Sequence, residues 1–272
     1  MKLGRIWLFV LVVGATCAVG QPNVSNDKVE MVGNRVFSTS ELESVARKCL
    51  AAYSASGQAA EPSRFQYCAS RIKVFLNNRG YLQATVEDQV TSVSATASLI
   101  TFTVHEGALI RLGRLQFRGA TTFSSNTLLD MFRLKSGDVV TGEALDNALY
   151  NRIETAYANL GYIDYWAVLD PTFGLKAGAN EGVLDLVITI DEGPPFAVGL
   201  VAFTGVDKER ESRLAEQMLV KRGDIFSRER FRAGLEQINQ TGEFEVIDAE
   251  KDVDLKRDEK SSTVDIIVHL KK

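Results

Sequence analysis

Apolar and polar residues follow one pattern through the middle of the chain. Period-two alternation predicts strands, and apolar residues at helical spacing predict amphipathic helices. Strands are expected at residues 111–119, 162–170 and 183–193, and helices at residues 124–134 and 141–161. Gly137 and Gly161 stand where the two helices are expected to end. The pattern therefore predicts the order β-α-α-β-β, in which the last two strands form a hairpin.

The same pattern recurs along the chain. One set of glycines is spaced by 86 residues and another by 81 residues. The pairs spaced by 86 are Gly33–Gly119, Gly107–Gly193, Gly119–Gly205 and Gly137–Gly223, and the series spaced by 81 is Gly80, Gly161 and Gly242. Several independent landmarks in one register indicate an internal repeat. Each copy is long enough to bury its own core, so we expect tandem domains and not a stacked solenoid.

The expected fold class is α+β. Each copy has a three-stranded sheet with one apolar face, and two helices are expected to cover that face. In the third copy, for example, Val264, Ile266 and Val268 point to one side of the last strand. We expect a signal peptide at residues 1–20, a linker at 21–27 and domains at 28–107, 108–193 and 194–272.

The N-terminus has the composition of a secretory signal. Lys2 and Arg5 precede an apolar stretch and then small residues, which predicts cleavage before Gln21. Lipidation at Cys17 is the alternative, although Thr16 is a poor residue to precede a lipidated cysteine. The chain has 31 Lys+Arg and 35 Asp+Glu, a net charge of −4. This mildly acidic balance lacks the basic surface expected of a nucleic-acid-binding protein.

Two cysteines remain after the signal peptide, and export places them in an oxidising compartment. Cys49 lies near the end of one predicted helix and Cys68 near the start of the next. If the two helices are antiparallel, the cysteines lie at similar heights, and a disulfide would stabilise the domain by about 3 kcal/mol. The alternative is a pair of buried, reduced thiols. No histidine lies nearby, which argues against a metal or redox site.

Candidate chemical groups are few. His105 and His269, the only histidines, belong to different copies and are expected on solvated strand faces. Glu106 and the Asp191–Glu192 pair stand where one copy joins the next, which suits a junction better than acid–base catalysis. Signatures of a hydrolase, a nucleotide-binding loop or a dinucleotide fold do not occur. We therefore expect no catalytic residue, no metal and no cofactor.

The candidate function is recognition by the main chain. A sheet that is covered on one face leaves edge strands whose N–H and C=O groups can pair with an extended polypeptide. We expect the first strand of each hairpin to be such an edge, at Tyr81–Glu87, Tyr162–Val168 and Phe244–Asp248. The candidate peptide-binding residues are Tyr81, Leu82, Tyr162, Ile163, Tyr165, Trp166, Phe244 and Val246. The alternative is that Trp166 and its neighbours pack between domains.

The repeated segments also resemble a known family. The opening strand and turn "FRGATTFS", then "LKSGDVVT", "NLGY" and the closing "TIDEGPPF" are similar to the polypeptide-transport-associated (POTRA) domain. The resemblance covers residues 28–272. It implies a location in the periplasm at the inner face of the outer membrane. The implied clients are unfolded outer-membrane or secreted polypeptides, and the implied partners are a separate β-barrel or assembly lipoproteins.

Three functions remain open on this basis. The first is a non-enzymatic module that binds polypeptides by β-strand addition. The second is a structural adaptor that joins cell-envelope proteins through fixed surfaces, and the third is an exported enzyme. Family members usually continue into a membrane β-barrel. The sequence in hand ends at "VDIIVHLKK", so we expect either a member without a barrel or the periplasmic part of a longer protein.

Overall fold

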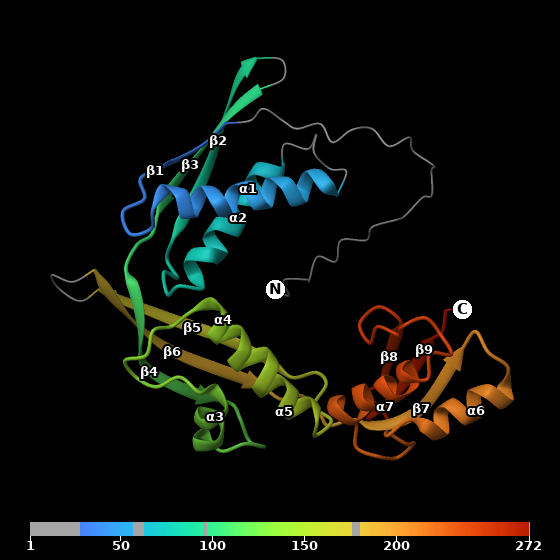
Figure 1. Ribbon diagram of the computed structural model, residues 1–272. Helices are drawn as coiled ribbons and strands as arrows, with labels where there is room; N and C mark the ends of the chain where they lie inside the picture. Colours follow the sequence, from blue (N-terminus) through green and yellow to red (C-terminus); the bar gives the residue numbers. More distant parts are fainter. Residues whose placement is uncertain (1–27, 57–62, 95–96, 176–179, 272) are drawn as a thin grey trace. The chain divides into compact units, whose positions relative to one another are not determined.

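The structure is a computed structural model that describes residues 28–56, 63–94, 97–175 and 180–271. The expected signal peptide and linker lie outside these residues. Three sheets of three strands follow one another along the chain, each with helices on one face (Figure 1). The predicted α+β tandem fold is therefore confirmed. The chain divides into two compact units, of which the second comprises Lys73–Thr85 and Glu106–Lys272.

The first domain contains a sheet in the order β1-β3-β2, in which β1 and β3 are parallel. Its elements are β1 (Lys28–Val32), α1 (Thr39–Ala55), α2 (Ser63–Asn77), β2 (Thr85–Ser94) and β3 (Ala97–His105). Leu42 and Ile72 from the two helices are fully buried, as are Ile100 and Phe102 from the central strand. The alternating apolar side chains of β3 thus form one side of the core, and the apolar stripes of α1 and α2 form the other side.

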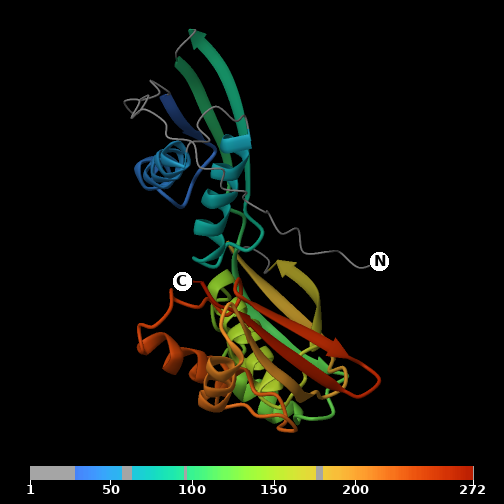
Figure 2. The same ribbon diagram turned by 90° about the vertical axis from the view of Figure 1, so that its right-hand side faces the viewer.

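The second domain has the sheet order β4-β6-β5. Its elements are β4 (Leu109–Arg118), α3 (Ser125–Phe132), α4 (Gly142–Asp146), η1 (Asn147–Glu154), α5 (Thr155–Ala158), β5 (Trp166–Leu175) and β6 (Glu181–Asp191). The single helix expected at 141–161 is present as three consecutive segments, and the central one, η1, is a π-helix. Figure 2 shows these helices on one face of their sheet. Leu184, Leu186 and Ile188 of β6 are buried beneath them.

The third domain has the sheet order β7-β9-β8. Its elements are β7 (Ala197–Thr204), α6 (Lys208–Gln217), α7 (Arg228–Gln240), β8 (Val253–Asp258) and β9 (Thr263–His269). Val264, Ile266 and Val268 are fully buried, as the alternation of the last strand predicts. In both the second and the third domain a polar residue caps the second long helix: Thr141 accepts from the amide of Ala144, and Ser227 from that of Arg230.

The landmarks of the repeat have a common conformation. Every glycine with a positive φ among the described residues belongs to the repeated series: Gly33, Gly80, Gly107, Gly119, Gly137, Gly161, Gly193, Gly205, Gly223 and Gly242. At Gly119, where φ is +78°, an added Cβ would also collide with the carbonyl oxygen of Ile190. The opening strand therefore turns past the end of the closing strand at a position that admits no side chain.

The first strand of each hairpin begins later than the sequence indicates. The strand expected at 162–170 begins at Trp166 and continues to Leu175, through the stretch expected to be a loop. The reason is that the amide of Tyr162 closes the preceding helix on the oxygen of Tyr157 (3.1 Å). In the first domain the amide of Tyr81 closes α2 in the same way, and the strand begins at Thr85.

The difference between the expected and the observed strand is largest in the third domain. Residues Phe244–Asp248, expected to be a strand, lie outside the sheet, and β8 begins at Val253. The side-chain amide of Asn239 holds this segment: its oxygen accepts from the amide of Ile247 (2.9 Å), and its nitrogen donates to the oxygen of Ile247 (3.1 Å). These bonds satisfy the main chain of Ile247, which the prediction had assigned to a sheet ladder.

Candidate functional site

The edge strand β5 is the strongest candidate for a binding site. It is ten residues long and pairs on one side with β6 in an antiparallel register. Among the described residues, no main-chain hydrogen bond outside that ladder involves Trp166–Leu175. Several large apolar side chains on it are exposed, including Trp166 (64%), Val168 (53%) and Leu175 (77%). A long apolar edge with unpaired main-chain groups is a template for another strand.

The register of β5 assigns its side chains to two faces. Leu169, Pro171 and Phe173 lie opposite Ile188, Leu186 and Leu184, which the helices bury, so this row faces the helical side of the sheet. Its members are Ala167, Leu169, Pro171, Phe173 and Leu175, all apolar. The open face instead has Trp166, Val168, Asp170 and Thr172. Because the helices leave Leu169 and Phe173 partly exposed, an added strand would extend the apolar surface on the helical side.

The other sheet edges are less suited to this role. On the outer side of β4, the main chain of the first half is already hydrogen-bonded. The amide of Leu112 donates to the oxygen of Asp138 (2.8 Å), and the amide of Val140 donates to that of Ile110 (2.9 Å). The equivalent half of β7 is sealed by Asp224, whose oxygen accepts from Val198 (2.7 Å). Strand β8 is open but mostly charged, with Lys256, Arg257 and Asp258 near its end, and β2 is mostly polar.

The structure separates the eight residues that the sequence singled out. Trp166 lies in β5, whereas Tyr162, Ile163 and Tyr165 lie in the turn that precedes it. Tyr81 and Leu82 likewise precede β2, and Phe244 and Val246 precede β8. Leu169, Phe173 and Leu175, which complete the apolar edge, were not among the predicted residues. Their alternation is present in the sequence, but Pro171 and Gly174 interrupt it and indicated a loop.

Two of the predicted residues serve the joints between domains. Ile163 packs against the core of the third domain, and Leu82 packs against the core of the second. This corresponds to the alternative that residues near Trp166 pack between domains, although it applies to Ile163 and not to the exposed Trp166. In the third copy, Phe244 packs against its own core with Arg210 over its ring (5.2 Å), and Val246 is 79% exposed.

The joint between the second and third domains also has polar contacts. The amide of Phe196 donates to the oxygen of Gly161 (2.9 Å). The side-chain oxygen of Asn159 accepts from the amide of Glu229 (2.9 Å), within the first turn of α7. Glu154 and Arg228 form an ion pair across the same joint (2.8 Å). The helix of one domain thus ends by capping a helix of the next.

The carboxylate of Glu192 is a structural group. It accepts hydrogen bonds from the amides and hydroxyls of Thr121 and Thr122 and from the hydroxyl of Tyr157 (2.8 Å). Burial raises the pKa of Glu192, but these hydrogen bonds outweigh it and lower the pKa to about 2. Burial also raises the pKa of Tyr157, which stacks on Tyr165 (4.6 Å). A carboxylate held in this way is ionised at neutral pH and is unsuited to donating a proton.

The two histidines are exposed and stand at the ends of β3 and β9. Nδ1 of His269 lies 2.9 Å from the hydroxyl of Thr204, and Nε2 lies 3.0 Å from Asp254, across the exposed side of the third sheet. In the described part of the chain, no cluster of three or more His, Cys, Asp or Glu could hold a metal ion. None of the described helices is long and apolar enough to cross a membrane.

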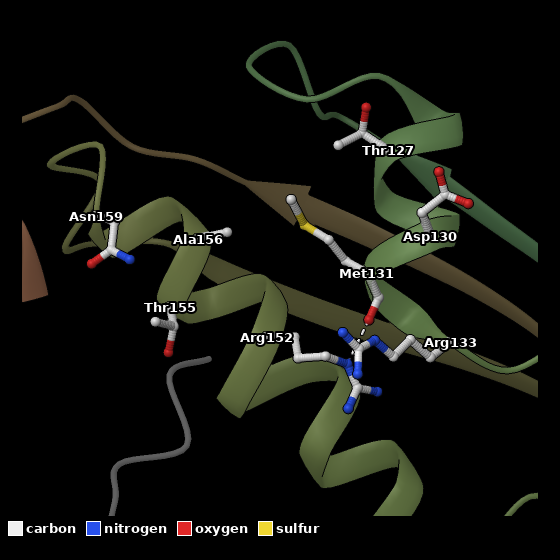
Figure 3. Close-up of a pocket in the computed structure, with 8 residues that line it drawn as sticks. All are labelled: Thr127, Asp130, Met131, Arg133, Arg152, Thr155, Ala156 and Asn159. Atoms are coloured by element: carbon white, nitrogen blue, oxygen red, sulfur yellow. Dashed lines mark hydrogen bonds between the residues drawn. The ribbon is translucent and has the colours of Figure 1, made fainter. Parts of the chain in front are cut away.

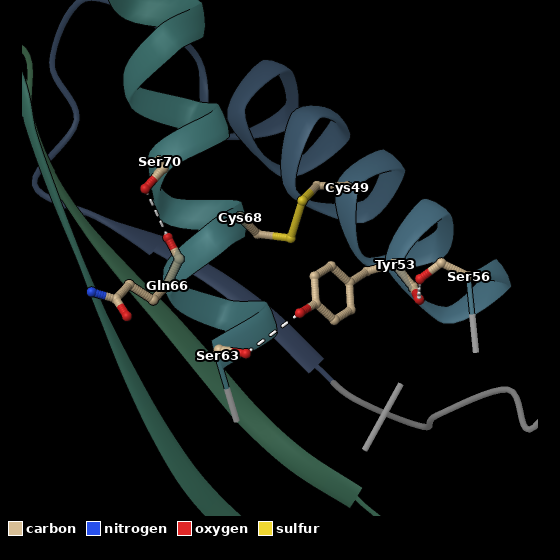
Figure 4. The surroundings of a disulfide bond; sticks show 7 residues. All are labelled: Cys49, Tyr53, Ser56, Ser63, Gln66, Cys68 and Ser70. Atoms are coloured by element: carbon tan, nitrogen blue, oxygen red, sulfur yellow. Dashed lines mark hydrogen bonds between the residues drawn. A yellow bond between two sulfur atoms is a disulfide. The ribbon is translucent and has the colours of Figure 1, made fainter. Parts of the chain in front are cut away.

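The two cysteines of the first domain form a disulfide. Cys49 of α1 is bonded to Cys68 of α2, with a Cα–Cα distance of 5.6 Å (Figure 4). Both side chains are buried. Beside the bond, the hydroxyl of Tyr53 lies 3.4 Å from that of Ser63. The structure therefore contains the bridge and not the pair of reduced thiols.

Comparison with known proteins agrees with the repeat. The sequence profile described as "POTRA: Surface antigen variable number repeat" matches residues 25–107, 110–193 and 196–272. A protein of Treponema pallidum (strain Nichols), named as an outer membrane protein assembly factor, is 26% identical over 84% of this chain and 27% of its own length. The outer membrane protein assembly factor BamA of Nitratidesulfovibrio vulgaris (strain Hildenborough) is 25% identical over 75% of this chain and 25% of its own length.

A solved structure has the same fold. The crystal structure of domains POTRA3-5 of Haemophilus influenzae BamA superimposes with a TM-score of 0.69 and 18% identity, over 91% of this chain and 96% of that one. The chain spans about a quarter of the length of the curated relatives that it matches. The match in fold therefore extends over nearly the whole chain, and the match in sequence over one part of each relative.

Proposed function

Because this chain belongs to the POTRA family, we propose that it is a non-enzymatic periplasmic module that receives unfolded outer-membrane or secreted polypeptides by β-strand addition. It acts in outer membrane protein assembly, at the inner face of the outer membrane. The relatives named as outer membrane protein assembly factors support this process. The observation that carries the proposed binding mode is the free, apolar edge of β5.

Strand addition at β5 suits clients of many sequences. The hydrogen bonds come from the main chain, which every polypeptide has, and each contributes about 0.5–1.5 kcal/mol. The side chains add a preference for pattern: apolar residues of the client would lie beside Leu169 and Phe173, and polar residues beside Asp170 and Thr172. Membrane β-strands have this alternation. A few such contacts give weak binding, with Kd on the order of 0.1–1 mM.

Pro171 limits the length of the pairing. It has no N–H group, so it contributes no donor to any ladder. A proline within an edge strand discourages continuous pairing, which protects the edge from association with other copies. We expect a client strand to pair mainly on one side of Pro171 at a time, over four or five residues.

The test is a backbone NMR titration of the full chain with a blocked ten-residue peptide of alternating valine and threonine. Amide shifts should concentrate in Trp166–Leu175 and leave β8 unchanged. The control peptide has the same composition in a sequence that groups the valines, and should bind several-fold more weakly. A peptide methylated on alternate main-chain nitrogens should not bind if its donors are needed. A flat response at millimolar peptide, or equal shifts in β8, would refute strand addition at β5.

The same titration distinguishes the adaptor. An adaptor recognises one folded partner through its side chains and ignores generic peptides. Its candidate partners are the separate β-barrel and the assembly lipoproteins that the resemblance implies. If none of the peptides binds, and a purified partner shifts the NMR signals of residues outside β5, the adaptor explains the data and the strand-addition module does not.

A further inference from the structure

A groove in the second domain has a different chemistry from the β5 edge. It lies between α3 and the end of the long helix that α4, η1 and α5 form together, and it has a volume of about 440 Å³. The residues that line it include Asp130, Met131, Arg133, Arg152 and Ala156. Figure 3 shows the guanidinium groups of Arg133 and Arg152 together at one end, with Met131 extending along the groove. The groove thus combines a cationic end with an apolar wall.

The two guanidinium groups lie close together, and their mutual repulsion costs free energy. Arg152 is fixed by its Nε, which donates to the oxygen of Met131 (2.6 Å), and by one Nη, which donates to the oxygen of Phe132 (2.9 Å). Arg133 ends α3 with φ of +62°, a left-handed conformation that strains a residue with a side chain. Burial and the charge of Arg133 together lower the pKa of Arg152. Within the described residues, neither arginine forms an ion pair with an acid.

The fold does not require this arrangement, because the third domain lacks it. Leu219 stands 86 residues after Arg133, two residues past the end of the corresponding helix α6. The long helix is also shorter there: Gly242 stands 15 positions after Ser227, whereas Gly161 stands 20 positions after Thr141. The longer helix of the second domain includes the π-helical segment η1, which supplies Arg152. π-helical segments are rare and often occur at functional sites.

We propose that this groove binds a carboxylate side chain of a polypeptide partner, flanked by apolar residues that pack against Met131 and Ala156. One carboxylate can accept hydrogen bonds from two guanidinium groups and relieves the repulsion between them. Met131 is a flexible apolar residue that adapts to different neighbours. Asp130 lines the same groove and leaves a net charge of +1 with the two arginines, which a singly charged carboxylate balances. A phosphate dianion or an anionic lipid surface would place excess negative charge next to Asp130.

The test uses two probes that differ by one group: the blocked peptide acetyl-Ser-Leu-Glu-Leu-Ser-amide and the same peptide with glutamine in place of glutamate. NMR of the full chain should show shifts of the Met131 methyl group and the Arg133 side chain with the glutamate peptide. The glutamine peptide should bind at least about tenfold more weakly, because it lacks the charge that strengthens the hydrogen bonds. Arg133→Gln should reduce binding of the glutamate peptide by a similar factor.

Arg118→Gln is the matched control, since Arg118 is an exposed arginine of the same domain outside the groove, and it should leave binding unchanged. Equal binding of the two peptides, shifts confined to β5, or no shift at millimolar peptide would overturn the proposal. A response to phosphatidylglycerol vesicles in place of the peptide would also overturn it. The peptide comparison needs only the unaltered chain, so it decides the question even if Arg133→Gln does not fold.

Discussion

Glu192→Gln should destabilise the second domain and remove a component of its acid sensitivity. Glu192 accepts hydrogen bonds from Thr121, Thr122 and Tyr157. It thereby connects the end of β6 to the turn after β4 and to α5. Glutamine has nearly the same shape, but it has no charge, and its NH₂ group replaces one acceptor. The substitution therefore tests the charge of the carboxylate with little change in packing.

The magnitude follows from the shift in pKa. The pKa of Glu192 falls from 4.5 to about 2 on folding. At 1.36 kcal/mol for each unit, ionisation contributes at most about 3 kcal/mol to the free energy of unfolding. Because the folded pKa is the lower one, this contribution is complete above about pH 5 and is lost as the pH falls toward 2. Glu192→Gln should therefore cost about 2–3 kcal/mol at pH 7 and much less at pH 2.5.

The assay is urea unfolding at a series of pH values, followed by the fluorescence of Trp166. Trp166 reports on the second domain, since it lies opposite Asp191, the neighbour of Glu192. Asp191→Asn is the matched control: it makes the same change in charge one residue away, where, among the described residues, the carboxylate accepts a single hydrogen bond, from the amide of Gly193 (3.2 Å). If the two substitutions have equal effects, or if Glu192→Gln keeps the wild-type dependence on acid, the assigned role of Glu192 is wrong.

Three further results are expected. Gly119→Ala should destabilise more than Gly137→Ala. Gly137 also has a positive φ but has open space around the new Cβ, so Gly137→Ala should cost about 1–2 kcal/mol in urea unfolding; equal losses would contradict the clash at Gly119. Joint replacement of Cys49 and Cys68 by alanine should cost about 3 kcal/mol for their separation of 19 residues, measured by thermal unfolding of the first domain, and an unchanged transition would count against the bridge. Asn159→Ala should speed hydrogen exchange of the first amides of α7, and unchanged protection would mean that the cap contributes little.

The order of elements could be predicted because its signals are local. Helical stripes, alternating strands and glycines at the turns each depend on a few neighbouring residues, and three copies repeat the test within one chain. The start of β5 could not be predicted in this way. Tyr162 and Ile163 look like the beginning of a strand because they are apolar. The amide of Tyr162 instead closes a helix, and Ile163 is partly buried against the core of the next domain.

The continuation of β5 was missed for a related reason. A proline usually marks the end of a strand, yet Pro171 lies opposite Leu186 within the ladder of β5 and β6. An edge strand accepts proline where the missing N–H faces away from its neighbour. Hydrophobic pattern reports which side chains are buried, but not which main-chain groups are paired. The position of an edge therefore depends on the sheet order, which is a property of the whole domain.

The repeat also does not indicate in which copy the hydrogen-bond partner of a residue lies. Asn78 and Asn159 stand two residues before Gly80 and Gly161, so they look like ordinary helix-ending residues of their own copies. Asn78 instead accepts from the amide of Glu143 (3.0 Å), as Asn159 accepts from that of Glu229, each at the start of a helix in the following copy. In the third copy the position is Gln240, which donates to Glu236 of its own helix (3.2 Å). The asparagine is thus explained by the domain that follows it, because a helix N-terminus needs an acceptor and only the neighbouring copy supplies this one.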